Sequence, residues 1–255
     1  MDEGATTVSA MISPVIEAAE EKGATKVLIS HEGLSLLSTD HISELLKGIG
    51  LPVRQVILFL RNIYEQALSI TSESNKKGWA LPIRAEHKKR YERTLNYPAI
   101  VQNWADSVGQ DAITVHAYSG RHSSIQNTFI SALGLINPSE GFFRRNRPNV
   151  SLLMPLQAVL GYTNILDGSE SYRAVSRLIA DIERPIGLFP AEVDLAKIIK
   201  QRYAAPLDHE LLTPHSDRLL AEPLTVDTLE HKRAMLQYVA KCCERISNAI
   251  EAGEL

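Results

Sequence analysis

The feature that most constrains the fold is a short apolar run, Val56-Ile-Leu-Phe-Leu60, which is followed directly by Arg61. The run is too short to span a membrane. Its β-branched and aromatic residues, with Gly50 and Pro52 just before it, predict a strand that is buried on both faces. A helix is expected next, because Asn62 is a good N-cap residue. The sequence therefore predicts a strand, a tight turn and a helix in succession.

Arg61 and Ser69 form a candidate anion site in this unit. Ile63, Ala67 and Ile70 share one helical face, so the helix has a side that can be buried. Arg61 lies at the carboxyl end of the predicted strand and Ser69 lies about two turns into the helix. Both can face the crevice where α/β sheets bind ligands, and arginine and serine both supply donors that suit phosphate. The alternative is an arginine that merely ends a strand and a solvated serine.

The residues before this unit predict another strand. Lys26–Ser30 predicts a short buried strand, preceded by a helix that Gly23 ends. Asp40 is expected to cap the next helix, with Gly48 near its end. Two strands joined by a crossover helix are most often parallel, so this pattern predicts an α/β fold with a doubly wound sheet.

The remaining elements are predicted to be mostly helical. Tyr97–Gly109 predicts a helix with a buried Trp104, and Asp111–Ser119 alternates apolar and polar residues as a half-buried strand does. Helices are also expected near 123–133, 152–165, 169–182, 194–202 and 227–250. The expected inward residues of the last helix are Leu229, Leu236, Val239, Cys243, Ile246 and Ile250. We therefore expect an α/β core over 1–166 and a helical C-terminal extension over 167–255.

Several segments together resemble sulfotransferases that use 3′-phosphoadenosine 5′-phosphosulfate (PAPS). In that family a strand-end arginine and a helix serine, spaced as Arg61 and Ser69 are here, hold the 3′-phosphate. Lys26–Ser35 resembles the strand and acidic turn that precede this motif in bacterial members, and Trp104–Ser119 resembles the helix and strand that follow it. The resemblance implies a three-layer, P-loop-NTPase-like parallel sheet flanked by helices. It also implies PAPS as co-substrate, no metal ion, and a hydroxyl of a carbohydrate or small molecule as acceptor.

The resemblance also indicates candidate residues for the chemistry. Glu32 is a candidate general base for the acceptor hydroxyl, provided that partial burial raises its pKa, and His31 is the neighbouring candidate. Arg145 and Arg147 lie in a basic stretch that resembles a family loop, where arginines can fold over the nucleotide. The alternatives are a structural turn for Glu32 and solvated loop positions for the other three residues.

The sequence does not contain the family's 5′-phosphosulfate loop. Gly4-Ala-Thr-Thr7 is the nearest cluster, but no apolar strand precedes it and no Gly-Lys-Ser/Thr follows. A catalytically inactive module of the same fold, serving in binding or interaction, therefore stays open beside the sulfotransferase. A kinase is a weaker alternative, because no Walker-type lysine or magnesium-ligand pattern is present. We expect coding sequence for the missing strand and loop upstream of Met1, since their loss would uncover sheet edges.

Composition excludes several other classes. The chain has 255 residues, of which 44% are hydrophobic and 22% charged, enough for one sizeable core. A net charge of −3 and a pI near 6.3 argue against a partner that is nucleic acid or a membrane surface. Cys242 and Cys243 are adjacent, which disfavours a disulfide between them and fits a reducing cytoplasm. No apolar run has the length of a membrane span or follows a signal-peptide pattern.

Overall fold

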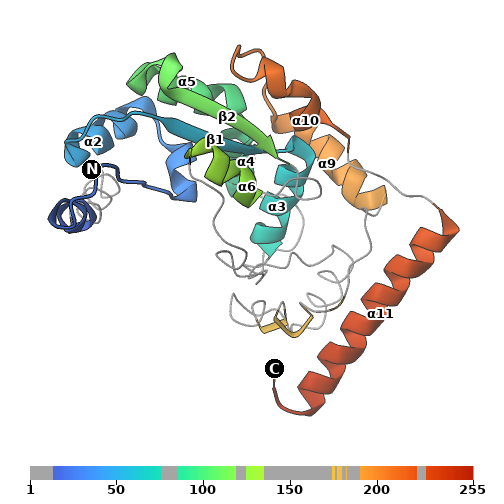
Figure 1. The fold of residues 1–255 in the computed structure, drawn as a ribbon. Coiled ribbons are helices and arrows are strands. Elements are labelled where there is room, and N and C mark those ends of the chain that lie inside the picture. Colours follow the sequence, from blue (N-terminus) through green and yellow to red (C-terminus); the bar gives the residue numbers. More distant parts are fainter. Residues whose placement is uncertain are drawn as a thin grey trace. The chain divides into compact units, whose positions relative to one another are not determined.

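A small parallel sheet is formed by two strands, β1 (Val56–Arg61) and β2 (Ile113–Tyr118), which run in the same direction (Figure 1). The computed structural model describes residues 14–75, 85–118, 125–134, 174–175, 177–179, 182, 190–222 and 228–254. This part of the chain is α/β and mostly helical, which confirms the predicted fold class at this level.

Helices make up most of the other described residues. Residues 14–21 are helical. The labelled α-helices are α2 (Thr39–Ile49), α3 (Ile63–Asn75), α4 (Ala85–Thr94), α5 (Tyr97–Val108), α6 (Ile125–Ala132), α9 (Pro190–Tyr203), α10 (Ser216–Leu220) and α11 (Leu229–Glu251). Short 3-10 helices are η1 (Glu32–Leu36), η2 (Gln110–Ala112) and η3 (Thr213–His215).

The chain forms two compact units, each assembled from three separate stretches. The first unit comprises Met1–Leu60, Asn96–Tyr118 and Ala205–Arg218. The second unit comprises Arg61–Leu95, Ser119–Ala204 and Leu219–Leu255. The predicted division at residue 166 falls outside the described residues and stays a prediction.

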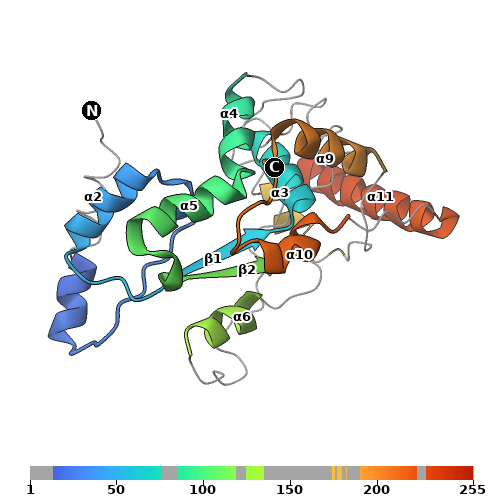
Figure 2. The ribbon, with the colours of Figure 1, turned by 90° about the horizontal axis from the view of Figure 1, so that it is seen from above.

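The core of the first unit lies between α2, α5 and the sheet. Ile42 and Leu45 of α2 are buried, and so are Val101 and Trp104 of α5. The side chains of β2 alternate between buried and half-buried, as the sequence predicted. Figure 2 shows α5 running alongside the strands. Asn103 fixes the contact by donating to the backbone carbonyl of Leu37 at 3.1 Å.

The second unit has α3 packed against α4 and α9. Ile63, Ala67 and Ile70 of α3 are at most 2% exposed, so the predicted buried face is confirmed. They form one apolar cluster with Tyr91 of α4 and Ile199 of α9, among other residues. The polar atoms within this cluster are satisfied locally: the hydroxyls of Thr71 and Tyr91 are 2.8 Å apart, and Lys200 donates to the Tyr64 hydroxyl at 2.9 Å. A second cluster in this unit packs α11 against residues 175–179.

The predicted strand at Lys26–Ser30 is wrong. The segment has no strand assignment, and Leu28 in its centre is 54% exposed. A strand needs a neighbour to take its backbone hydrogen bonds, and no described strand pairs with this segment. The predicted crossover around the 39–49 helix is therefore not formed. The parallel pair consists of β1 and β2, connected in sequence through α3, α4 and α5.

Two helix boundaries and one face also differ from the sequence prediction. Ser38, not Asp40, caps α2 by accepting from the His41 N–H, and the helix runs past Gly48 to Gly50, whose φ is 67°. β1 is buried only at Leu58 and Leu60, whereas Ile57 and Phe59, which lie on the other face of the strand, are half-buried.

The inward face of α11 was predicted correctly only in part: Ile246 is buried, and Val239 and Cys243 are half-buried against the same cluster. Leu229 and Leu236 are 64% and 65% exposed, and Ile250 is 42% exposed. The residues that α11 buries are Met235, Tyr238, Cys242, Ile246 and Ala249. Both sets follow three- and four-residue steps, but four of the predicted positions come one residue after a buried one, which places them about 100° further round the helix.

None of the described helices combines the length and apolarity that a membrane crossing requires.

Candidate functional site

The turn between β1 and α3 is organised by Asn62, which is 4% exposed. Its Oδ1 accepts from the backbone N–H groups of Tyr64 at 3.1 Å and Glu65 at 3.3 Å. These donors have no partner within a helix, and an asparagine at the N-cap satisfies them. The predicted cap of α3 is therefore confirmed, and the turn that carries Arg61 is fixed by a buried side chain.

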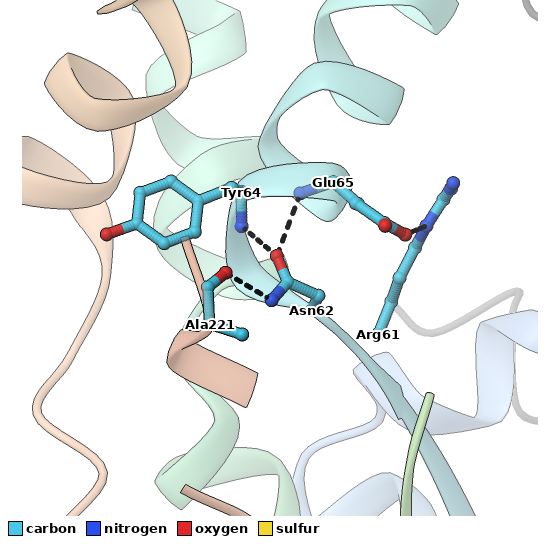
Figure 3. Close-up of polar contacts among 5 residues, drawn as sticks. All are labelled: Arg61, Asn62, Tyr64, Glu65 and Ala221. Atoms are coloured by element: carbon cyan, nitrogen blue, oxygen red, sulfur yellow. Dashed lines mark hydrogen bonds and ion pairs between the residues drawn. The ribbon is translucent and has the colours of Figure 1, made fainter. Parts of the chain in front are cut away.

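The same side chain connects the turn to a distant part of the second unit. Asn62 Nδ2 donates to the carbonyl of Ala221 at 2.9 Å. Figure 3 shows the amide lying between the start of α3 and Ala221. One amide thus uses both its donor and its acceptor group, and its orientation is set by these partners.

An ion pair joins the end of β1 to the first turn of α3. Arg61 Nε donates to Glu65 Oε2 at 3.2 Å, with side chains that are 29% and 13% exposed. In Figure 3 the Glu65 carboxylate points toward Arg61, whereas the Tyr64 ring points away from it. The guanidinium is therefore held at the amino-terminal end of α3, on the side of the helix that carries Glu65.

Ser69 lies on this same side of α3. It follows Glu65 by four residues, and residues at that spacing are neighbours on a helix surface. Ser69 is half-buried. Glu65, which pairs with Arg61, therefore lies one helical turn before Ser69 on the same side of α3.

His31 and Glu32 belong to the first unit, and both are exposed. His31 Nδ1 accepts from the Gly33 N–H at 3.0 Å, which caps η1, so this nitrogen carries no proton. The Glu32 backbone carbonyl accepts from the Ser35 hydroxyl at 2.8 Å. These contacts build the turn, and the partial burial that a general-base role for Glu32 requires is not seen.

The other candidates lie outside the described residues. These are Arg145 and Arg147 of the basic stretch, and the cluster at 4–7.

A second group of ionisable residues lies in the first unit, near β2. The His116 ring stacks on Phe59 with centroids 5.3 Å apart, and its buried Nε2 has no hydrogen-bond partner in the described part of the chain. The pKa of His215 is lowered from its ordinary value, first because burial disfavours the charged form and then because His116 and Arg218 repel a positive charge. Among the described residues, no three His, Cys, Asp or Glu side chains are grouped closely enough to hold a metal ion.

No protein-family model, curated protein or solved structure is detectably similar to the chain. The geometry of the chain's own residues is therefore the basis for a functional proposal.

Glu65 is the residue that the sequence reasoning missed. Two signals for it are present in the sequence. It stands three residues after the cap Asn62, the position that a capping box reserves for glutamate, and four residues after Arg61. A carboxylate in the first helical turn also interacts favourably with the helix dipole.

Proposed function

We propose that the chain is a sulfotransferase-like protein that binds PAPS through its 3′-phosphate at Arg61 and Ser69. The observation that supports this proposal is the Arg61–Glu65 ion pair, which holds the guanidinium at the start of α3, with Ser69 one helical turn after Glu65. A strand-end arginine and a helix hydroxyl both supply donors that suit the oxygens of a phosphate group. In this proposal β1 and β2 belong to a wider parallel sheet, which is the middle layer of a three-layer fold of the P-loop-NTPase kind.

The proposed reaction transfers a sulfuryl group to a hydroxyl of a carbohydrate or small molecule. The acceptor oxygen attacks sulfur, the bond between sulfur and the bridging phosphate oxygen breaks, and adenosine 3′,5′-bisphosphate leaves. The hydroxyl proton passes to a base, for which Glu32 is the candidate. Arg145 and Arg147 are proposed as further nucleotide ligands.

A second candidate function is a module of the same fold that binds the nucleotide without catalysing transfer. The exposure of Glu32 favours it, because the candidate base lacks the partial burial that its proposed role requires.

Binding of two nucleotides tests the proposed site. Adenosine 3′,5′-bisphosphate should bind more tightly than adenosine 5′-monophosphate, and calorimetry can measure both affinities. Arg61→Ala removes a charge-assisted hydrogen bond, which contributes about 1.5–3 kcal/mol, so bisphosphate affinity should fall roughly ten- to a hundredfold. Ser69→Ala should act in the same direction with a smaller effect. Affinity for the monophosphate should change little in either variant.

Equal affinities of the parent protein for the two nucleotides would contradict the proposed function. So would a folded Arg61→Ala protein that keeps the parent's preference for the bisphosphate. Incubation with labelled PAPS and a phenol or a chitooligosaccharide then separates the two candidates. Transfer of label that is lost in Glu32→Gln supports the enzyme, and nucleotide binding without transfer supports the binding module.

A further inference from the structure

We propose that Glu65 is a positioning residue, whose carboxylate holds the Arg61 guanidinium in place to receive the 3′-phosphate. The inference rests on the proposed function, because it assigns a role within the same site. It concerns a residue that does not itself contact the nucleotide.

The position of Glu65 is fixed by the backbone of the turn. Its N–H is held by Asn62 Oδ1, and Asn62 is in turn held by the carbonyl of Ala221. The Glu65 side chain therefore extends from a fixed backbone position in the first turn of α3. A carboxylate there also interacts favourably with the dipole of α3.

The ion pair with Glu65 restrains the Arg61 side chain. An arginine side chain has many rotamers, and binding a phosphate with a mobile arginine means losing that freedom at the moment of binding. Arg61 is already held through Nε at 3.2 Å, and its partner is only 13% exposed, so water screens the pair less than it screens a surface pair. The guanidinium is thus oriented before the nucleotide arrives.

The chemistry of a guanidinium permits one arginine to bind a carboxylate and a phosphate together. A guanidinium has five N–H donors in one plane, and the bond from Nε to Glu65 uses one of them. Glu65, the anchor of Arg61, lies one helical turn before Ser69 on α3, so the two proposed ligands and the anchor belong to one strand–turn–helix unit. The alternative role for a carboxylate at this place is to weaken binding, because it repels a phosphate. The two roles predict opposite effects of removing the carboxylate.

Two substitutions at Glu65 separate these roles. Glu65→Ala removes the anchor, so affinity for adenosine 3′,5′-bisphosphate should fall about three- to tenfold, the factor expected from fixing one long side chain, with monophosphate affinity unchanged. Glu65→Gln keeps an oxygen that accepts from Nε and should stay within about threefold of the parent. Glu92→Ala is the matched control. It breaks the exposed Lys88–Glu92 pair of α4, also spaced by four residues, and should alter neither affinity.

The outcomes are distinct. A preference for the bisphosphate that is reduced in Glu65→Ala and restored in Glu65→Gln supports the inference. Tighter bisphosphate binding in both variants would overturn it, because Glu65 would then be a competitor for Arg61, while the proposed function would stand. An unchanged affinity in Glu65→Ala together with a loss in Arg61→Ala would also overturn it. No preference in the parent protein would overturn the proposed function itself. Circular dichroism of each variant verifies that the fold is kept.

Discussion

At the scale of single residues, Asn62 serves more backbone groups than an ordinary helix cap. It accepts from two N–H groups and donates to one carbonyl, all within a buried environment. Removing it would leave these groups without their partner, and a buried backbone group without a partner is costly.

We expect Asn62→Ala to lower the free energy of unfolding by about 2–3 kcal/mol, the loss of a cap plus that of a buried hydrogen bond. Asn96→Ala is the control. Asn96 caps α5 through one bond, from the Ala99 N–H at 3.2 Å, so its loss should cost about 1 kcal/mol. Urea denaturation of both variants measures the difference. Equal losses would mean that neither the second N–H bond nor the Ala221 contact of Asn62 adds to stability.

His215 predicts a dependence of stability on pH. Its pKa in the folded protein lies below the ordinary value of 6.5, so the unfolded chain binds the proton more readily. The stability contributed by a neutral His215 is therefore fully present above about pH 6.5 and is lost as the pH falls through 6.5 toward the lowered value.

Thermal unfolding between pH 7.5 and 5 tests this prediction. The melting temperature of the parent protein should fall more steeply over this range than that of His215→Gln, which has no proton to bind. His116→Gln should also reduce the slope, because His116 contributes to the lowered pKa of His215. Parallel curves for the parent and His215→Gln would show that this histidine does not couple to folding.

At the scale of helices, α11 shows how burial rather than hydrophobicity sets the effect of a substitution. Met235 is 1% exposed and its neighbour Leu236 is 65% exposed. Met235→Ala should lower the free energy of unfolding by about 2–5 kcal/mol, because it leaves a cavity in the cluster with Val175 and Ile179. Leu236→Ala should change it by no more than about 0.5 kcal/mol. The two variants, compared by denaturation, form a matched pair on one helix.

Sequence reasoning succeeded where the signal for an element was local. α3 begins at an asparagine cap and presents Ile63, Ala67 and Ile70 at helical spacing, and α5 ends at Gly109, which has a φ of 85°. These features need no knowledge of distant residues. The candidate pair Arg61 and Ser69 rests on the same local unit, and its role in binding phosphate stays a prediction.

Sequence reasoning failed where distant residues decide whether an element forms or which of its faces is buried. Apolar residues cover about half the circumference of α11, and only the packing of residues 175–179 selects which of them are buried. Lys26–Ser30 has the composition of a strand, yet strand formation depends on a pairing partner elsewhere in the chain. The hydrogen bond from Asn62 to Ala221 spans 159 positions, so the local sequence around Asn62 contains no signal for it.

At the scale of the whole molecule, the two units are interleaved along the chain. The first unit needs its third stretch, which contributes the fully buried Leu212 and the hydrogen bond from Gln110 to Glu210. The second unit needs α9, whose Ala196 and Ile199 are fully buried in the cluster around α3.

A fragment of residues 1–166 should therefore not fold as an independent core. It would lack both of these stretches and would leave apolar side chains of each unit without cover. We expect broad, poorly dispersed amide resonances and no cooperative thermal transition, in contrast to the full chain. A fragment with dispersed resonances and a sharp transition would instead support the predicted division after residue 166.

The interleaving also determines when the protein can fold during its synthesis. The six stretches alternate between the units, so the chain passes between them five times. Ribosomes add about 5–20 residues per second, and the last stretch of the first unit is made about 150 residues after the end of its first stretch, a delay of roughly 8–30 s. During that time the first unit lacks the stretch that contributes the buried Leu212. The nascent chain is therefore a natural client for chaperones that shield apolar segments at the ribosome exit.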